Sequence, residues 1–273
     1  MTISTLLITG GTGFIGTQLQ KHFAKKNIAV TLLKRDSPIE GTFDGIINLA
    51  GHPLNKNRWN QKIKKLIYDS RISTTQRIVD YIKNTPHKPK FLISGSAIGY
   101  YEAENTFSHK LCHDWEKTAR EAENYGVRVC LMRTGIVLGK NGGALATMLP
   151  AFKLGLGAQI GNGLQWMSWI HMNDLINMID FIITHEEING PVNFTAPHPV
   201  THKAFVQTLA KTLHRPCLLK LPEFIVKMLF GQMGQELLLT GKPILPDKVL
   251  SLGYHFKFPL LKEALNDIFG DAS

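Results

Sequence analysis

The 273-residue chain is poor in cysteine: it has Cys112, Cys130 and Cys217, and an odd number cannot pair completely. Their spacing matches neither a metal site nor a redox motif, so we expect no metal site and a reducing, cytoplasmic location. Long apolar runs are also missing. The nearest, Phe224–Leu239, is interrupted by polar residues and predicts a packed helix or helix pair rather than a membrane span. The first strand-like run, Ile3–Thr9, is too short for a secretion signal, so we expect no membrane partner.

Acidic residues are scarce relative to basic ones. Lysine and arginine number 31 against 21 aspartates and glutamates, which gives a formal net charge of +10. Such an excess favours an acidic partner, either nucleic acid or a phosphorylated ligand, although a solvated surface rich in lysine would give the same count. The basic residues are scattered and form neither a basic tail nor a nucleic-acid motif. We therefore expect a nucleotide cofactor and no nucleic acid.

The first segment with a clear pattern is "LLITGGTGFIGTQLQKHFAKKNIAVTLLKRD", Leu6–Asp36. A short apolar run typical of a strand is followed by glycines, then by apolar residues on one helical face, then by a second strand-like run, Val30–Leu33. A glycine triplet is a weak signal alone. Here it follows a strand, opens a helix and leads to a second strand, which is the context that a dinucleotide-binding turn requires.

Each glycine of the turn has a separate physical reason. Gly10 suits a tight turn, Gly13 lets the backbone approach a pyrophosphate, and Gly16 lets the helix pack close to the sheet. The helix would begin at Phe14 and Ile15 and present free N–H groups to the anion. The sequence therefore predicts that these five residues bind a dinucleotide.

The end of the second strand predicts which dinucleotide is bound. NAD-binding proteins place a carboxylate here for the adenosine ribose, whereas this chain has Lys34 and Arg35. Two cations suit a 2′-phosphate, although cations are also common at exposed strand ends. Asp36 comes too late along the chain and is interpreted as a turn residue. We therefore predict NADP(H) as the cofactor.

Four motifs in order carry a family resemblance: "ITGGTGFIG", "INLAG" (Ile47–Gly51), "SGSAIGYY" (Ser94–Tyr101) and "WIHMNDL" (Trp169–Leu175). Together they resemble the extended short-chain dehydrogenase/reductase superfamily, in its NAD(P)-dependent epimerase branch, which is similar to nucleoside-diphosphate-sugar epimerases. The segment "LLLTGKPILPDKVLSLGYHFKFPLLKEAL" resembles that branch's small C-terminal domain of unknown function. The resemblance covers essentially the whole chain.

This resemblance implies an α/β fold, a Rossmann-type doubly wound parallel sheet with an interleaved, mostly helical C-terminal substrate lobe. It implies a dinucleotide-binding domain in residues 1–140, completed by 168–196. Residues 141–167 and 197–273 would form the substrate-side lobe and the small C-terminal domain.

The resemblance also implies further cofactor contacts, at Leu49, Ala50, Gly51, Arg71, Ser94, Gly135 and Gly139. The small residues would lie along the adenosine, Arg71 would reach the phosphates, and the turn Thr134–Gly139 would pass the nicotinamide carboxamide. For the small residues the structural alternative is a buried strand end, and for Arg71 it is a surface arginine.

A glycine-rich stretch that includes Trp166, Trp169 and His171 is predicted to face the substrate. The alternatives are that the two tryptophans form a second small core and that His171 orients a loop through a hydrogen bond.

The catalytic residues depart from the family pattern. Ser96 matches the family's catalytic serine, but the positions of the usual Tyr-x-x-x-Lys pair hold Phe107 and Leu111, which cannot ionise. Tyr100 and Tyr101 are candidates to supply the proton. Further candidates, each with a purely structural alternative, are His109, Lys110, His113 and His171.

These observations predict an NADP(H)-binding, oxidoreductase-like protein of the extended short-chain class that lacks the usual pair. One alternative is a nucleoside-diphosphate-sugar epimerase or dehydratase, and another is a non-catalytic NADPH-binding sensor or scaffold. Fold alone does not decide between them. We expect a small-molecule substrate, either a nucleotide sugar or a carbonyl compound, and a monomer or homodimer.

Overall fold

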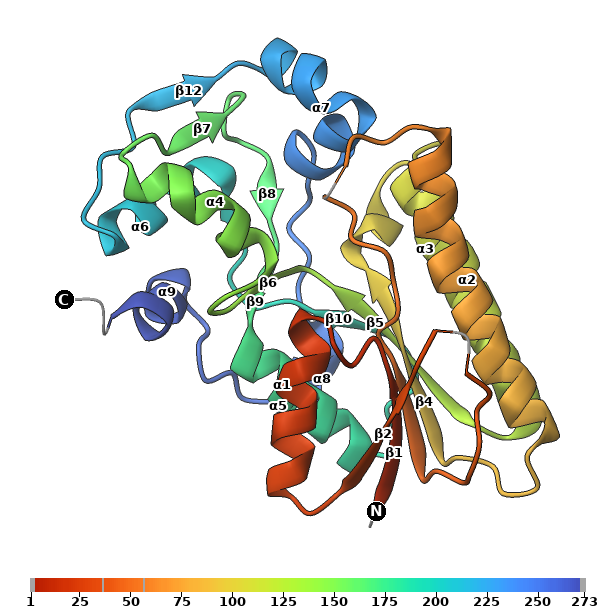
Figure 1. The fold of residues 1–273 in the computed structure, drawn as a ribbon. Helices are drawn as coiled ribbons and strands as arrows, with labels where there is room; N and C mark the ends of the chain where they lie inside the picture. Colours follow the sequence, from red (N-terminus) through yellow and green to blue (C-terminus); the bar gives the residue numbers. More distant parts are fainter. Residues whose placement is uncertain (1–2, 36, 56, 271–273) are drawn as a thin grey trace. The chain divides into compact units, whose positions relative to one another are not determined.

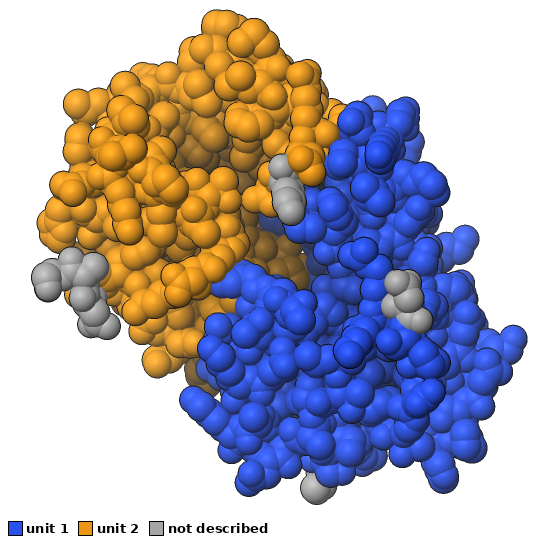
Figure 2. Space-filling view, in the orientation of Figure 1, with its two compact units in different colours: residues 1–54, 60–133, 176–192 blue, residues 55–59, 134–175, 193–273 orange. Residues whose placement is uncertain are grey.

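The structure is a computed structural model that describes residues 3–35, 37–55 and 57–270, so the predicted turn residue Asp36 lies outside the described residues. The chain divides into two compact units, coloured separately in Figure 2. Unit 1 comprises residues 1–54, 60–133 and 176–192, and unit 2 comprises residues 55–59, 134–175 and 193–273. The chain passes between the units several times, as the predicted interleaving requires.

A six-stranded sheet forms the centre of unit 1 (Figure 1). Its strands, in spatial order, are β10 (Gly190–Phe194), β5 (Arg128–Thr134), β4 (Phe91–Ala97), β3 (Gly45–Asn48), β1 (Thr5–Thr9) and β2 (Ala29–Leu33). The pairs β1–β2, β1–β3 and β3–β4 are parallel. Strands β3 and β4 are almost wholly buried, which explains their continuous apolar runs. The predicted doubly wound parallel sheet is confirmed.

Helices cover both faces of this sheet (Figure 1): α1 (Phe14–Lys25) and α5 (Met172–Thr184) lie on one face, and α2 (Gln61–Asn84) and α3 (Phe107–Arg120) on the other. The side chain of Asn60 caps α2 and that of Thr106 caps α3, each accepting a hydrogen bond from a first-turn N–H. A buried cluster joins α2, α3 and the sheet, and its members include Leu7, Ile46, Ile78, Ile82, Leu92, Ala119 and Leu131. Two short 3-10 helices, Ile98–Tyr101 and Glu121–Tyr125, flank α3.

The strand order changes direction between β1 and β3. Strand β1 is followed by β2 on one side, whereas β3, β4 and β5 continue on the other. In the register of these strands, Thr9 lies beside both Leu33 and Asn48, so the carboxyl ends of the strands finish together. Open α/β sheets bind ligands outside the carboxyl ends of their strands at such a point.

Unit 2 contains short strands and helices. In chain order they are β6 (Ile136–Leu138), α4 (Gly143–Lys153), β7 (Ala158–Ile160), β8 (Trp166–Met167), β9 (Trp169–His171), β11 (Val200–Thr201), α6 (His202–Thr212), β12 (Leu219–Leu221), α7 (Glu223–Leu238), α8 (Asp247–Ser251) and α9 (Leu261–Phe269). The strands form three pairs: β6–β9 and β7–β12 are parallel, and β8–β11 is antiparallel.

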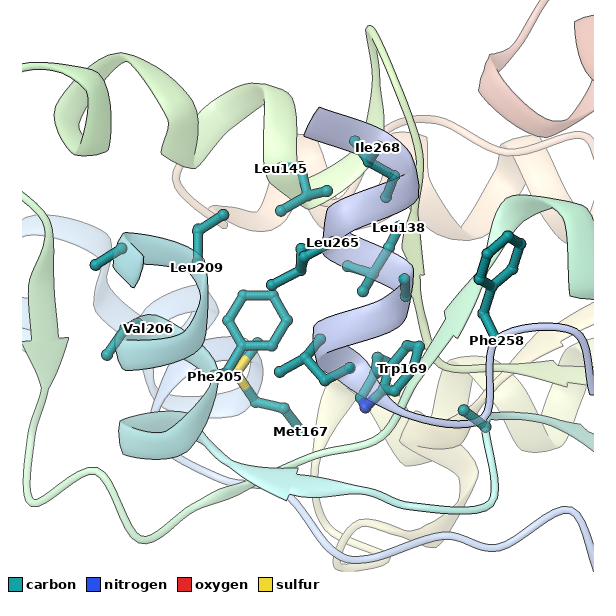
Figure 3. Packing of buried hydrophobic residues seen from close by; sticks show 14 of the residues in the cluster. Leu138, Leu145, Met167, Trp169, Phe205, Val206, Leu209, Phe258, Leu265 and Ile268 are labelled. Carbon is teal, nitrogen blue, oxygen red and sulfur yellow. The ribbon is translucent and has the colours of Figure 1, made fainter. Parts of the chain in front are cut away.

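Unit 2 has its own apolar core, in which α6 packs against α9 and the β6–β9 pair (Figure 3). Phe205 and Leu209 of α6 meet Leu265 of α9, with Leu138 and Trp169 beside them. The core lies among elements that are far apart in the sequence, so unit 2 depends on long-range packing for its stability.

The apolar stretch predicted as a helix or helix pair forms α7, which breaks at Gly231 (φ 58°, ψ −138°). A helix pair is therefore confirmed, although Phe224 and Met228 in its first half are exposed. Among the described residues, the structure contains no helix with the length and apolar character needed to cross a membrane.

Candidate functional site

Gly10 and Gly16 are required by the packing of the protein itself. Gly10 has a φ of 65°, and a Cβ there would lie 2.5 Å from the carbonyl oxygen of Leu49. A Cβ on Gly16 would lie 2.4 Å from the carbonyl oxygen of Gly10. These contacts bring the turn close to the residues that follow β3 and to the start of α1. The left-handed φ of Gly10 fits the predicted tight turn, whereas the nearest neighbours of Gly16 belong to the turn and not to the sheet.

Gly13 differs from the other two glycines. Its φ of −77° suits any residue, and the nearest atom to a Cβ there is the Gly10 oxygen at 3.1 Å. A Cβ there would therefore have one close neighbour, and among the described residues no other heavy atom beyond the adjacent residues lies within 4 Å of it. Gly13 is the N-cap of α1 and has no side chain to accept the N–H groups of Phe14 and Ile15 that follow it. The space and the uncapped helix start fit an anion such as a pyrophosphate.

Lys34 and Arg35 directly follow β2, and both side chains are exposed. Because Leu33 lies beside Thr9 in the sheet, these cations come next to the glycine turn. Arg77 of α2, which sequence reasoning missed, donates a hydrogen bond to the carbonyl oxygen of Arg35. The backbone of Arg35 is thus held while its side chain faces solvent.

The end of β3 lies directly against the glycine turn. The N–H groups of Leu49 and Ala50 both donate to the hydroxyl of Thr9, at 3.1 Å each. Leu49 and Ala50 are half-buried and Gly51 is exposed. The structure therefore brings these three predicted residues beside Gly10, and their contact with the cofactor stays a prediction.

Arg71 of α2 is only 9% exposed, so the alternative of a surface arginine is wrong. Its guanidinium faces the ring of Trp115 at 5.2 Å, and a Cβ on Gly51 would lie 2.7 Å from its Cζ. Both of its hydrogen bonds leave from Nη1, to the carbonyl oxygens of His52 and Ile67. Burial lowers the pKa of Arg71 to about 10, so it stays charged at neutral pH. In the part of the chain that the structure describes, no carboxylate pairs with it, which leaves a buried positive charge beside Gly51.

Ser94 lies inside the protein, fully buried. Its hydroxyl accepts a hydrogen bond from the Asn48 side chain at 3.3 Å, and Asn48 also donates to Thr75 and accepts from Thr9. This polar network lies under the ends of β1, β3 and β4. Ser94 supports those ends, and its direct contact with the cofactor stays a prediction.

Ser96 joins an ion pair that sequence reasoning missed. Its hydroxyl donates to Oε1 of Glu116 at 2.6 Å, and Arg133 binds both carboxylate oxygens of Glu116 at 2.8 Å. All three residues are buried: Ser96 is 5% exposed, Glu116 3% and Arg133 7%. With its proton committed to Glu116, the Ser96 hydroxyl has only its lone pairs to offer a ligand.

Arg133 also holds the two candidate tyrosines. Its Nη1 donates to the hydroxyl of Tyr101 at 3.0 Å, and its Cζ lies 3.5 Å from the ring centroid of Tyr100. Burial alone would lower the pKa of Arg133, but its bonds to Glu116 and Tyr101 raise that pKa above its ordinary value. The structure thus gathers Ser96, Tyr100 and Tyr101 around one buried ion pair at the carboxyl ends of β4 and β5.

The two positions of the missing pair lie on α3. Phe107 begins the helix, with Nζ of Lys64 at 5.6 Å from its ring centroid, and Leu111 is 4% exposed. Nδ1 of His109 is hydrogen-bonded to the carbonyl oxygen of Tyr100, at 2.7 Å. This histidine therefore orients the 3-10 turn that precedes α3. Lys110 and His113 are exposed on α3.

The two tryptophans predicted on the substrate side, both in unit 2, differ sharply in exposure to solvent. Trp166 is 39% exposed, whereas Trp169 is fully buried in the core of that unit (Figure 3). The Trp169 indole donates to the carbonyl oxygen of His198 at 3.2 Å. Trp169 therefore follows the alternative of a core residue, and Trp166 remains the predicted substrate contact.

His171 is 3% exposed, and its ring lies 4.1 Å from that of Phe258. Burial lowers its pKa to about 4, so it is neutral near pH 7, and its Nδ1 accepts a hydrogen bond from the Asn173 N–H. These contacts match the alternative in which His171 orients a loop. Gly135 packs within unit 2, where a Cβ would lie 2.4 Å from the Ser168 oxygen. The contacts of Gly135 and Gly139 with the cofactor stay predictions.

Two known families together match most of the chain. Residues 6–194 match the NAD dependent epimerase/dehydratase family, and residues 221–268 match a domain of unknown function, DUF1731. The chain is 38% identical to the epimerase family protein SDR39U1 homolog, chloroplastic, of Arabidopsis thaliana, over 97% of this chain and 86% of that protein. It is 37% identical to the epimerase family protein SAR0825 of Staphylococcus aureus (strain MRSA252), over 96% of this chain and 98% of that protein.

Solved structures are similar over nearly the whole chain. The crystal structure of human epimerase family protein SDR39U1 (isoform 2) with NADPH superposes with a TM-score of 0.90 and 32% identity, covering 98% of this chain and 99% of that one. A nucleoside-diphosphate sugar epimerase from Corynebacterium glutamicum gives a TM-score of 0.78 and 26% identity, covering 98% of this chain and 59% of that one.

Proposed function

Because the chain belongs to the NAD-dependent epimerase/dehydratase family, we propose that it is an NADPH-binding, oxidoreductase-like protein of the extended short-chain class. The observation that carries the proposal is the open space at Gly13, at the uncapped start of α1 and beside two exposed cations. The human relative crystallised with NADPH supports the same choice of cofactor.

In this proposal, residues of unit 1 hold the dinucleotide from its pyrophosphate to its adenosine. The N–H groups that follow Gly13 would hold the pyrophosphate, and Lys34 and Arg35 would hold the 2′-phosphate. The unbalanced charge of Arg71 suits a further phosphate oxygen. When bound, NADPH would supply a hydride, and the residues of the chain would bind and orient the dinucleotide. We further propose that residues 1–140 with 168–196 bind the dinucleotide, and that 141–167 and 197–273 serve the substrate.

We expect Arg35→Asp to weaken NADPH binding by roughly 1–3 kcal/mol, the scale of a lost charge-assisted hydrogen bond, and to affect NADH much less. Fluorescence titration of both dinucleotides measures this. Lys117→Asp, an equal change of charge at an exposed position on α3, is the matched control and should leave both affinities unchanged. Tighter binding of NADH than of NADPH by the unmodified protein would contradict the prediction.

The substrate is proposed to be a small carbonyl compound or a nucleotide sugar. The test is NADPH oxidation by the purified protein with a panel of both classes. A true epimerase or dehydratase would interconvert nucleotide sugars without net NADPH consumption. Phe107 and Leu111 weaken that alternative because neither side chain exchanges a proton.

A non-catalytic NADPH-binding sensor or scaffold is a second candidate, and the geometry of Ser96 favours it. The hydroxyl donates its hydrogen bond to Glu116 rather than toward a ligand. Tight NADPH binding with no turnover on any compound of the panel would support this candidate over the oxidoreductase. For either function we propose a cytoplasmic monomer or homodimer, and an odd number of cysteines, which cannot all pair, fits a reducing compartment.

A further inference from the structure

Arg133, at the end of β5, connects a buried carboxylate to a phenol. Its Nε and Nη2 both bind Glu116, and its Nη1 donates to the hydroxyl oxygen of Tyr101 at 3.0 Å. All three hydrogen-bonding edges of the guanidinium are therefore used. The Ser96 hydroxyl adds a third hydrogen bond to the Glu116 carboxylate. The Glu116 carboxylate accepts three hydrogen bonds from two residues, two of them from Arg133, so the guanidinium is held in one orientation, with Nη1 at Tyr101.

The environment of Tyr101 contrasts with that of Tyr68, on α2. The Tyr68 hydroxyl donates to the carboxylate of Asp114 at 3.0 Å, and burial together with Asp114 raises the pKa of Tyr68. At Tyr101 a guanidinium donates to the hydroxyl oxygen instead of accepting from it. A carboxylate beside a phenol opposes negative charge on the phenol oxygen, whereas a guanidinium beside it does not.

Tyr100 completes the arrangement from the other side. Its ring lies 3.5 Å from Cζ of Arg133, a distance typical of a cation facing an aromatic ring. The carbonyl oxygen of Tyr100 is close to Nδ1 of His109, which anchors the 3-10 turn that carries both tyrosines. The turn and the guanidinium thus limit each other's movement, and the Tyr101 hydroxyl stays at the carboxyl end of β4.

Building on the function proposed above, we propose that Arg133 is a positioning residue: held by Glu116, it orients the Tyr101 hydroxyl and balances the charge of its phenolate. When Tyr101 gives up its proton, the phenol O–H bond breaks and a new O–H bond forms on the acceptor oxygen of the substrate. The electron pair stays on the phenolate, whose charge Arg133 offsets, and water returns the proton. In this arrangement the cation comes from β5, since Leu111 on α3 has no charge.

The test is the reactivity of each tyrosine toward N-acetylimidazole near pH 8, measured as acetylation rate by peptide mass spectrometry on the full chain. A phenolate is the reactive form, and burial with Asp114 raises the pKa of Tyr68, so we expect Tyr68 to react at least about tenfold more slowly than Tyr101. In the double variant Arg133→Met with Glu116→Gln, which leaves no buried charge unpaired, Tyr101 should lose about tenfold of that rate. Arg133→Lys keeps a cation and should retain part of it.

A purely structural role for Arg133 predicts the opposite change. Loss of the ion pair would then loosen the turn, expose Tyr101 and leave its rate unchanged or higher. Either that result, or a Tyr101 rate no faster than that of Tyr68 in the unmodified protein, overturns the proposal. NADPH titration of the same proteins distinguishes a failure of the proposed function from a failure of the role proposed for Arg133. Failure to bind NADPH would reject the proposed function, and the acetylation rates would still decide the role of Arg133.

Discussion

Replacing Gly13 by valine is expected to reduce NADPH affinity at least about 100-fold while the protein stays folded. The backbone at Gly13 has a φ of −77°, which valine adopts without strain, and the nearest atom to its Cβ is 3.1 Å away. The Gly10 oxygen would have to give by a few tenths of an ångström, and among the described residues nothing else beyond the adjacent residues lies within 4 Å of the Cβ, so we expect the valine to obstruct the space that we assign to the pyrophosphate. Fluorescence titration with NADPH, alongside thermal unfolding of the free protein, measures both effects.

Gly10→Ala is the matched control for this experiment. At Gly10 the φ of 65° and the Leu49 oxygen 2.5 Å from a Cβ make any side chain strain the protein itself. We expect Gly10→Ala to lower the unfolding temperature, whereas Gly13→Val should leave it within a few degrees of the unmodified protein. Normal NADPH affinity in Gly13→Val would show that the dinucleotide binds elsewhere.

The second large effect is expected in stability, from the single substitution Arg133→Met. Glu116 is 3% exposed, so removal of its partner leaves a buried carboxylate without a counter-charge. Breaking a buried pair in this way costs about 3–5 kcal/mol of unfolding free energy. Urea unfolding of the unmodified and substituted proteins measures the loss.

The double variant Arg133→Met with Glu116→Gln distinguishes an unpaired charge from lost packing. With no charge left to bury, it should recover most of the stability that the single variant loses, since apolar replacements of buried pairs are often neutral. A single variant that loses less than about 1 kcal/mol would show that water reaches Glu116. A double variant no more stable than the single would attribute the loss to packing instead.

The strand, glycine turn, helix and second strand could be predicted because their signals are local. Apolar periodicity distinguishes a helix from a strand, and the left-handed φ of Gly10 is a property of one residue. The position of Lys34 and Arg35 beside the glycine turn follows from the lengths of those elements and the parallel pairing of β1 with β2. The placement of these residues beside the glycine turn could therefore be predicted from the chain, and their contacts with the cofactor stay predictions.

Only the tertiary structure decided how the side chains around Ser96 pair. Glu116 and Arg133 are 17 residues apart on a helix and a strand, and neither sits at a spacing that predicts a contact. The sequence left Arg71 open between a phosphate contact and a surface arginine, and Trp169 open between a substrate contact and a core residue. Only the packing buried both side chains. Local patterns show which face of an element is apolar, but a hydrogen bond between two elements depends on their packing angle and register. The sequence by itself thus determined the dinucleotide fold and the loss of the usual Tyr-x-x-x-Lys pair, while the packing of α3 against β4 and β5 decided which charges meet there.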